Sequence, residues 1–121
     1  MLRQIMKLNY TSFGSINIDG KHYDMDVVID GGKIVKREKG KSRLLKSEYG
    51  HTPLTPHENI PWECTQLIIG TGFYGSLPIA DAMKDEARNR GIDLKIMTTA
   101  KACKYLESKG EQANAVLHLT C

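Results

Sequence analysis

Three apolar runs in the second half of the chain are separated by two segments with helical spacing. The runs lie at residues 66–69, 94–97 and 113–120, and the first has apolar side chains at successive positions, as in a parallel strand buried on both faces. The positions with helical spacing are Ile79, Ala80, Met83 and Ala87, and then Ala102, Cys103 and Leu106. This pattern predicts a β-α-β-α-β unit, whose right-handed crossovers place both helices over the sheet.

Capping residues predict the ends of the two helices. Ser76 is the predicted N-cap of the first helix, because its hydroxyl can accept a hydrogen bond from the first turn, and Gly91 is its predicted end. Thr98 or Thr99 is predicted to cap the second helix, which ends at Gly110.

A shorter capping pattern occurs upstream, in the sequence Thr55-Pro56-His57-Glu58. A threonine followed three positions later by glutamate is typical of a capping box, in which the glutamate returns to the N–H of the cap. Pro61 would limit this helix to about one turn.

The first third of the chain has the alternation of strands. Residues 15–18 alternate and lead into Asp19-Gly20, which favours a two-residue hairpin because both positions need a positive φ. A second apolar run follows at residues 25–29. These features predict an antiparallel meander of about three strands.

Together the two parts predict one α/β domain over residues 1–121, with three layers and a mixed sheet. Residues 1–12 have no clear period and are interpreted as a loose arm or an edge strand. The 121 residues are 40% hydrophobic and 26% charged, which fits a globular domain. The sequence has no apolar run of ~18 residues and no signal peptide, so we expect no membrane association and a cytoplasmic location.

The three cysteines, Cys64, Cys103 and Cys121, are scattered and form no CxxC pair. This spacing indicates reduced thiols in a reducing compartment. No histidine or cysteine pair has the spacing of metal ligands, so no metal site is predicted.

The turn at residues 70–75 reads Gly-Thr-Gly-Phe-Tyr-Gly, the GxGxxG pattern of dinucleotide-binding loops. The acidic residue that would bind ribose about 20 positions later is missing, because residues 97–99 are Met-Thr-Thr. We therefore expect no cofactor. Two interpretations remain open: a purely structural turn, or a site where backbone N–H groups bind a small anion. The predicted anion-binding residues are Gly70, Thr71, Gly72, Gly75 and Ser76.

Parallel strands end on a common edge of the sheet, and ligands bind outside that edge. The residues predicted to lie on this rim are His51, Thr98, Thr99, Thr120 and Cys121. His118 ends the last strand and is either a hydrogen-bonded core histidine or a weak candidate for an acid–base catalyst.

Seven basic residues lie between Lys33 and Lys46, opposed only by Glu38. They are interpreted as a solvated strand edge and loop, or alternatively as a docking surface for an acidic protein partner. Nucleic-acid binding is disfavoured, because no aromatic side chains alternate with these charges and the net charge is only +3.

Several segments in this order resemble one small α/β family of unknown function. They are FGSINIDGKHYDMDVVI, His51-Thr52-Pro53, LIIGTG, GIDLKIMTTAKACKYL and the final HLTC. Eukaryotic members of that family include an adipogenesis-associated protein, and a more distant branch includes a mitochondrial assembly factor of respiratory complex I. The resemblance covers residues 12–121 and implies a compact mixed α/β fold, but it transfers no catalytic residues.

The sequence thus favours a binding or assembly domain without catalysis. The alternative is a small enzyme or sensor that binds a phosphate- or carboxylate-bearing molecule at residues 70–76, with His118 as the acid–base group.

Overall fold

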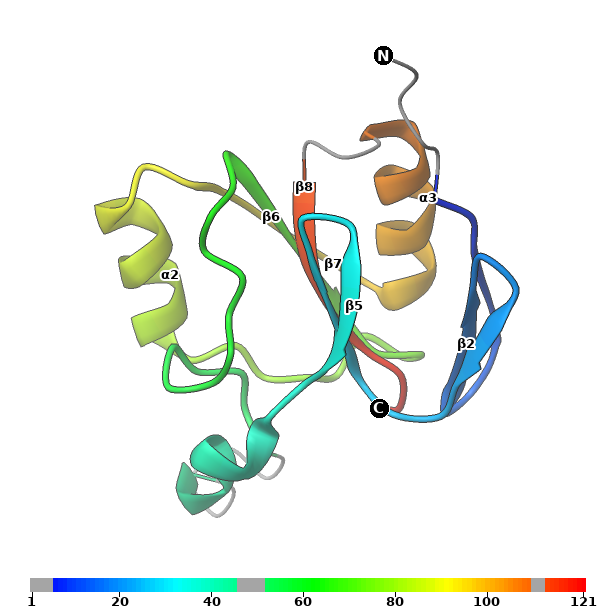
Figure 1. Cartoon of the computed structure of the whole chain (residues 1–121). Helices are drawn as coiled ribbons and strands as arrows, with labels where there is room; N and C mark the ends of the chain where they lie inside the picture. Colours follow the sequence, from blue (N-terminus) through cyan, green and yellow to red (C-terminus); the bar gives the residue numbers. More distant parts are fainter. Residues whose placement is uncertain (1–5, 46–51, 110–112) are drawn as a thin grey trace.

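A computed structural model describes residues 6–45, 52–109 and 113–121 (Figure 1). Two sheets and two α-helices build the fold. The elements in chain order are β1 (Leu8–Ser12), β2 (Ser15–Ile18), β3 (Lys21–Tyr23), β4 (Val27–Asp30), β5 (Lys33–Lys36), the 3₁₀ helix η1 (Lys39–Leu45), β6 (Gln66–Thr71), α2 (Asp81–Asn89), β7 (Asp93–Met97), α3 (Thr99–Lys109) and β8 (Ala113–His118). None of the described helices is long and apolar enough to cross a membrane.

The larger sheet has the strand order β5-β4-β8-β6-β7. β6 pairs in parallel with both β7 and β8, which confirms the predicted β-α-β-α-β unit, whereas β4 pairs antiparallel with β8. Each residue of β8 is buried, because this strand lies in the middle of the sheet. The mixed α/β class is therefore as predicted.

Helices cover both faces of this sheet, and the smaller sheet forms an outer layer. Ile68 faces a core shared with α3 and with the buried side chains of β1 and β2, whereas Leu67 and Ile69 face a second core shared with Met83 of α2. Helix α3 consequently lies between the two sheets, and α2 lies on the opposite face of the larger sheet (Figure 1).

The expected antiparallel meander of about three strands is present as β1-β2-β3, but the region also contains a further hairpin. Five strands occupy this region, and they divide between two sheets: β1-β2-β3 form the smaller sheet, while the β4–β5 hairpin joins the larger one. The division follows from burial, because the side chains of residues 27–29 are all buried, as expected for an inner strand. Asp19 and Gly20 have φ values of 51° and 83°, so the predicted hairpin turn is confirmed. Within residues 1–12, Leu8–Ser12 form strand β1 at the edge of the smaller sheet, and residues 1–5 lie outside the described residues.

The predicted start of the first helix at Ser76 is wrong. Helix α2 begins at Asp81, after Ala80, which is extended and provides no side-chain cap. The chain before it is held extended by a bridge between Leu54 and Ile79, in which Leu54 N donates to Pro78 O (2.9 Å) and Ala80 N donates to Leu54 O (3.0 Å). The predicted end is confirmed, since Gly91 has a φ of 68° and follows the helix directly after its C-cap.

The predicted capping box at residues 55–58 does not form a helix. Thr55 Oγ1 accepts a hydrogen bond from His57 N (3.3 Å), but the Glu58 carboxylate is bound to a buried arginine instead of to the cap. For the second helix, α3 begins at Thr99, and Thr98 O accepts from Ala102 N (2.9 Å). Its predicted end at Gly110 lies outside the described residues.

Candidate functional site

The carboxyl ends of the parallel strands meet on one edge of the larger sheet, as predicted. Thr99 connects the three segments there: its Oγ1 donates to His118 O (2.6 Å) and accepts from Gly72 N (2.9 Å). Thr71 Oγ1 donates to Met97 O (3.0 Å), which links the glycine turn to the end of β7. The structure thus brings the glycine turn, Thr99 and His118 together.

The glycine turn does not present a row of unengaged N–H groups. Phe73 N donates to Thr120 O (3.1 Å), Ser76 N to Cys121 O (3.0 Å) and Leu77 N to Thr71 O (2.9 Å), in addition to the bond from Gly72 N. The turn also does not lead directly into a helix, because α2 begins five residues after Ser76. Anion binding at residues 70–76 stays a prediction, but the N–H groups of Gly72, Phe73 and Ser76 already bind this chain.

The packing of the chain requires a glycine at position 72. Its φ is +108°, and a Cβ atom there would overlap the main-chain oxygen of Thr120 and lie 3.1 Å from Cδ2 of His118. The pattern that resembles a dinucleotide fingerprint therefore also allows the turn to pack closely against the segment that follows β8.

His118 is buried and is hydrogen bonded through both ring nitrogens. Its Nδ1 lies 2.6 Å from Oδ2 of Asp26, and its Nε2 lies 3.3 Å from Oγ1 of Thr120. The same Asp26 carboxylate accepts from Leu119 N (2.9 Å) and from Nη1 of Arg37 (2.9 Å). Because an ionised carboxylate only accepts hydrogen bonds, His118 donates from Nδ1 and presents Nε2 to Thr120.

Arg37 corrects the interpretation of residues 33–46 as uniformly solvated. Its side chain is 1% exposed, and it forms a two-bond pair with Glu58, from Nε to Oε1 (2.6 Å) and from Nη2 to Oε2 (2.9 Å). Glu58 also accepts from Ser42 Oγ, which lies 2.7 Å from Thr55 Oγ1. Lys46 lies outside the described residues.

These contacts form one buried network, Asp26–Arg37–Glu58, with His118 at its end. Burial favours the neutral form of the Asp26 carboxyl, but hydrogen bonds from His118 and Leu119 and the charge of Arg37 outweigh burial and lower its pKa. Burial likewise disfavours the charged Arg37, yet the two carboxylates raise the pKa of its guanidinium. Two carboxylates and one guanidinium leave a formal charge of −1, which a proton on His118 brings to zero.

Asp26, Arg37 and Glu58 were not predicted from the sequence as residues of the site. Asp26 stands beside the apolar run of β4, and Arg37 follows the last residue of β5, so a charged residue adjoining a strand is the only local signal. Nothing local indicates that these side chains meet, because 21 positions separate Arg37 from Glu58 and 92 separate Asp26 from His118.

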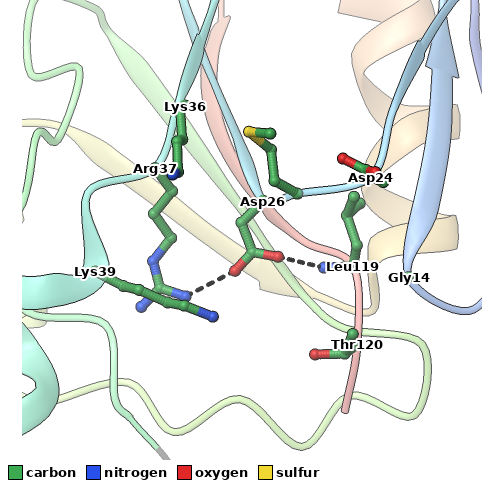
Figure 2. A pocket seen from close by; sticks show the side chains of 9 residues that line it. Gly14, Asp24, Asp26, Lys36, Arg37, Lys39, Leu119 and Thr120 are labelled. Atoms are coloured by element: carbon green, nitrogen blue, oxygen red, sulfur yellow. Dashed lines mark hydrogen bonds and ion pairs between the residues drawn. The ribbon is translucent and has the colours of Figure 1, made fainter.

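A cavity of about 180 Å³ lies beside this network. Its charged and polar lining comes from Asp24, Asp26, Lys36, Arg37, Lys39 and Thr120, and its other lining residues are Gly14, Met25 and Leu119. In Figure 2 the Asp26 carboxylate lies between the Arg37 guanidinium and the Leu119 N–H, with Lys39 and Thr120 on the lower side of the view.

Next to the cavity the surface carries a cluster of aromatic side chains, which we call the aromatic cluster: Phe13, Phe73 and Tyr74. They are 54%, 40% and 73% exposed. Phe73 lies 6.0 Å from Phe13 and 5.1 Å from Tyr74, measured between ring centroids, and Phe13 lies 6.1 Å from Tyr74. Tyr10 supports the cluster from below, 5.9 Å from Phe73.

Two separate turns supply the aromatic cluster, and the segment after β8 holds them together. Gly14 N donates to Leu119 O (2.8 Å), and Phe73 N donates to Thr120 O (3.1 Å). Burial raises the pKa of the Tyr10 phenol to about 12, and that hydroxyl also donates to Leu119 O (2.6 Å). Main-chain hydrogen bonds therefore hold the two turns that carry the cluster beside each other.

The remaining candidates are placed as follows. Thr98 is half-buried, and its Cγ2 would lie 3.1 Å from a Cβ atom at position 75. The Sγ of Cys121 lies 3.8 Å from Oγ1 of Thr120. His51 lies outside the described residues. Among the residues that the structure describes, no group of three histidine, cysteine or acidic side chains could hold a metal ion.

Comparisons with known proteins place the chain in a family and a fold. Residues 8–118 match the family described as "Protein of unknown function (DUF498/DUF598)". The crystal structure of the conserved hypothetical protein PH1505 from Pyrococcus horikoshii OT3 is 31% identical, with a TM-score of 0.74 over 96% of this chain and 100% of that chain. No curated protein matches at a significant level.

Two further solved structures share the fold at lower identity. MT938 is 23% identical with a TM-score of 0.70, over 96% of this chain and 99% of that one. A Bordetella pertussis protein described as a Mth938-like domain is 13% identical with a TM-score of 0.62, over 95% of this chain and 86% of that one. The resemblance to a small α/β family of unknown function is confirmed at this level, and its eukaryotic branches stay a prediction.

Proposed function

We propose that this chain, which belongs to the DUF498/DUF598 family of proteins of unknown function, is a protein-binding domain that docks its partner on the aromatic cluster. The observation that carries the proposal is the exposure of Phe13, Phe73 and Tyr74 in one contiguous group. Aromatic side chains are enriched at the centres of protein interfaces, and contiguous apolar patches on a surface mark interaction sites.

The fixed geometry of the aromatic cluster supports this function. Both turns that carry it are hydrogen bonded to the segment after β8, at Leu119 and Thr120, so the backbone of the turns needs little ordering when a partner binds. Loops that are already held in place lose less conformational freedom on association, which improves affinity.

The charges beside the cluster indicate the chemistry of the partner. Lys36 and Lys39 line the cavity that also contains Gly14, the neighbour of Phe13, and the whole chain has a net charge of +3. We therefore expect a partner segment with an apolar side chain for the rings and acidic residues for the lysines. This retains the predicted acidic partner, but moves its contact from the whole basic segment to the end of β5 and the start of η1.

Selection of short random peptides displayed on phage, with the whole chain as bait, tests this function. Enriched peptides should combine one aromatic or large aliphatic residue with neighbouring Asp or Glu. Tyr74→Ser should weaken their binding roughly 10- to 30-fold, as expected for an interface hot spot. Raising the ionic strength toward ~0.15 M should weaken it further, because the charged contacts are exposed.

Ile96→Ser is the matched control. Ile96 is 41% exposed and lies on β7, the edge strand opposite β5, which carries Lys36. It should leave peptide binding unchanged. The proposal is wrong if no acidic–apolar peptide is enriched, or if Tyr74→Ser and Ile96→Ser bind the peptide equally. Sedimentation that shows a dimer abolished by Tyr74→Ser would also contradict it, because the occupant would then be a second copy.

A further inference from the structure

The side chains around His118 are arranged as a carboxylate, a base and a hydroxyl, which is the order found around activated nucleophiles. Asp26 fixes the imidazole through Nδ1 at 2.6 Å, and the opposite nitrogen, Nε2, lies 3.3 Å from the hydroxyl of Thr120. A carboxylate that orients a base, next to a hydroxyl within reach of that base, is the arrangement that activates serine and threonine nucleophiles, and the second distance is commonly somewhat long before substrate binds.

This series of side chains ends at the cavity. His118 itself is 5% exposed and lines no part of it, whereas Thr120 is half-buried and forms part of the wall. The reactive end is therefore the Thr120 hydroxyl, and the base behind it is shielded from solvent. The cavity, at about 180 Å³, is smaller than the ~300–1,000 Å³ of pockets for drug-sized ligands, so it suits a small molecule.

We propose that this cavity is an acyl-transfer site for small esters that carry an anionic group. Thr120 is the nucleophile, His118 the general base and Asp26 the residue that positions His118. Lys36 and Lys39 in the same wall are placed to attract the anionic end of the substrate. This inference does not rest on the aromatic cluster, although it shares Lys36 and Lys39 with the proposed partner site.

The chemistry balances with water as the only other reactant. Thr120 Oγ forms a bond to the acyl carbon while its proton moves to Nε2 of His118. The bond from the acyl carbon to the leaving oxygen breaks, and that oxygen takes a proton from a water in the cavity and departs as the alcohol. The hydroxide that remains attacks the acyl-threonine, and the bond from the acyl carbon to Thr120 Oγ breaks. Thr120 Oγ takes the proton back from Nε2 as it leaves, which releases the carboxylic acid and restores the hydroxyl.

The buried network favours the charge that this step creates. Asp26, Glu58 and Arg37 together have a formal charge of −1, and the imidazolium that forms during proton transfer brings the sum to zero. Asp26 is also held by Arg37 and by the Leu119 N–H, so it stays in place while the proton moves between Thr120 and His118.

Hydrolysis of p-nitrophenyl acetate and of its anionic succinate analogue by the whole chain tests the proposal. We expect a higher kcat/KM for the succinate ester, and a peptide with acylated Thr120 in the mass spectrum after rapid quenching. Thr120→Val, which keeps the shape and removes the hydroxyl, should lower the rate roughly 10²- to 10⁴-fold, whereas Thr120→Ser should retain activity. His118→Gln keeps an N–H for Asp26 but has no basic nitrogen, so its rate should fall similarly.

Thr65→Val is the matched control, because Thr65 is exposed at the opposite end of β6. Circular dichroism checks that each variant is folded, and Lys39→Gln should slow only the anionic ester. The proposal is overturned if folded Thr120→Val hydrolyses both esters like the wild type, or if the acyl group is found only on Cys121 or lysines. Thr120→Val is also expected to bind the selected peptides like the wild type, so a failure of the acyl-transfer proposal can be told apart from a failure of the partner-binding proposal.

Discussion

Replacement of Gly72 by alanine tests whether the glycine turn is required for packing or for a ligand. At Gly72 the chain has a φ of +108°, and its N–H and C=O are bound to Oγ1 and N of Thr99, at 2.9 and 3.2 Å. An added methyl group would overlap the main-chain oxygen of Thr120. The backbone cannot move away without breaking the hydrogen bonds to Thr99.

Two terms give the expected cost of Gly72→Ala. A non-glycine residue in a disfavoured backbone conformation costs about 1–3 kcal/mol. Overpacking against main-chain atoms costs about 1–3 kcal/mol more. The sum, roughly 2–6 kcal/mol, is a large part of the ~5–15 kcal/mol that stabilises a typical domain.

Gly91→Ala serves as the control that has a backbone cost without overpacking. Gly91 also has a positive φ, 68°, but a Cβ atom there would meet nothing within 4 Å. Its replacement should cost only a backbone term, and this term should be at the low end, about 1–2 kcal/mol, because its φ lies in the ordinary left-handed region. Urea denaturation of both variants, followed by circular dichroism, gives the two free energies of unfolding.

A packing role for Gly72 is refuted if Gly72→Ala is no less stable than Gly91→Ala. That result would mean that the turn has room for a methyl group, and that its glycine is not required for packing against the segment after β8. A stable Gly72→Ala variant that loses affinity for phosphate would instead restore the anion-binding hypothesis for residues 70–76.

Three further predictions concern buried groups. Arg37→Met should lower the free energy of unfolding by about 3–5 kcal/mol, because it leaves buried carboxylates unpaired. Arg88→Met is the control: it breaks an exposed pair with Asp85 and should cost less than ~1 kcal/mol. Equal losses of the two variants in urea denaturation would contradict this prediction. Folding lowers the pKa of Asp26, so its contribution to stability is complete above its unfolded pKa of ~3.9 and is lost as the pH falls through its lower folded value. Asp26→Asn lacks this contribution. Its free energy of unfolding, measured against pH, should therefore fall less steeply in acid than that of the wild type. Burial, and then the charge of Glu107, raise the pKa of the Cys103 thiol to about 12, so iodoacetamide at ~pH 8 should alkylate it only after unfolding, which mass spectrometry of the peptides can check.

The parts of the fold that could be predicted from the sequence depend on local periodicity. The strand at 66–71, the helix that ends before Gly91 and the next strand all follow from spacing and a helix-ending glycine. The start of α2 could not be predicted, because Ser76 is a good N-cap by type but residues 78–80 are held extended by Leu54, about 25 positions away.

The candidate site shows the same division. The gathering of Thr99, His118 and the glycine turn follows from parallel strand ends and was predicted. The burial of Arg37 was not, since its sequence neighbours Lys36 and Glu38 are charged and exposed and its partners come from other segments. Phe13 and Phe73 likewise meet only because two distant turns bind the same segment after β8.

The central place of β8 has a consequence for how the chain folds during synthesis. The β4–β5 hairpin and the β6–β7 pair contact the rest of the larger sheet only through β8, for example where Val28 pairs with Val116 and Ile69 pairs with the same valine. Until that strand leaves the ribosome, both halves have an unpaired inner edge that can join another chain. We expect nascent copies to need protection from aggregation until β8 has been synthesised, and the larger sheet to be completed in one cooperative step when this strand inserts between the two halves.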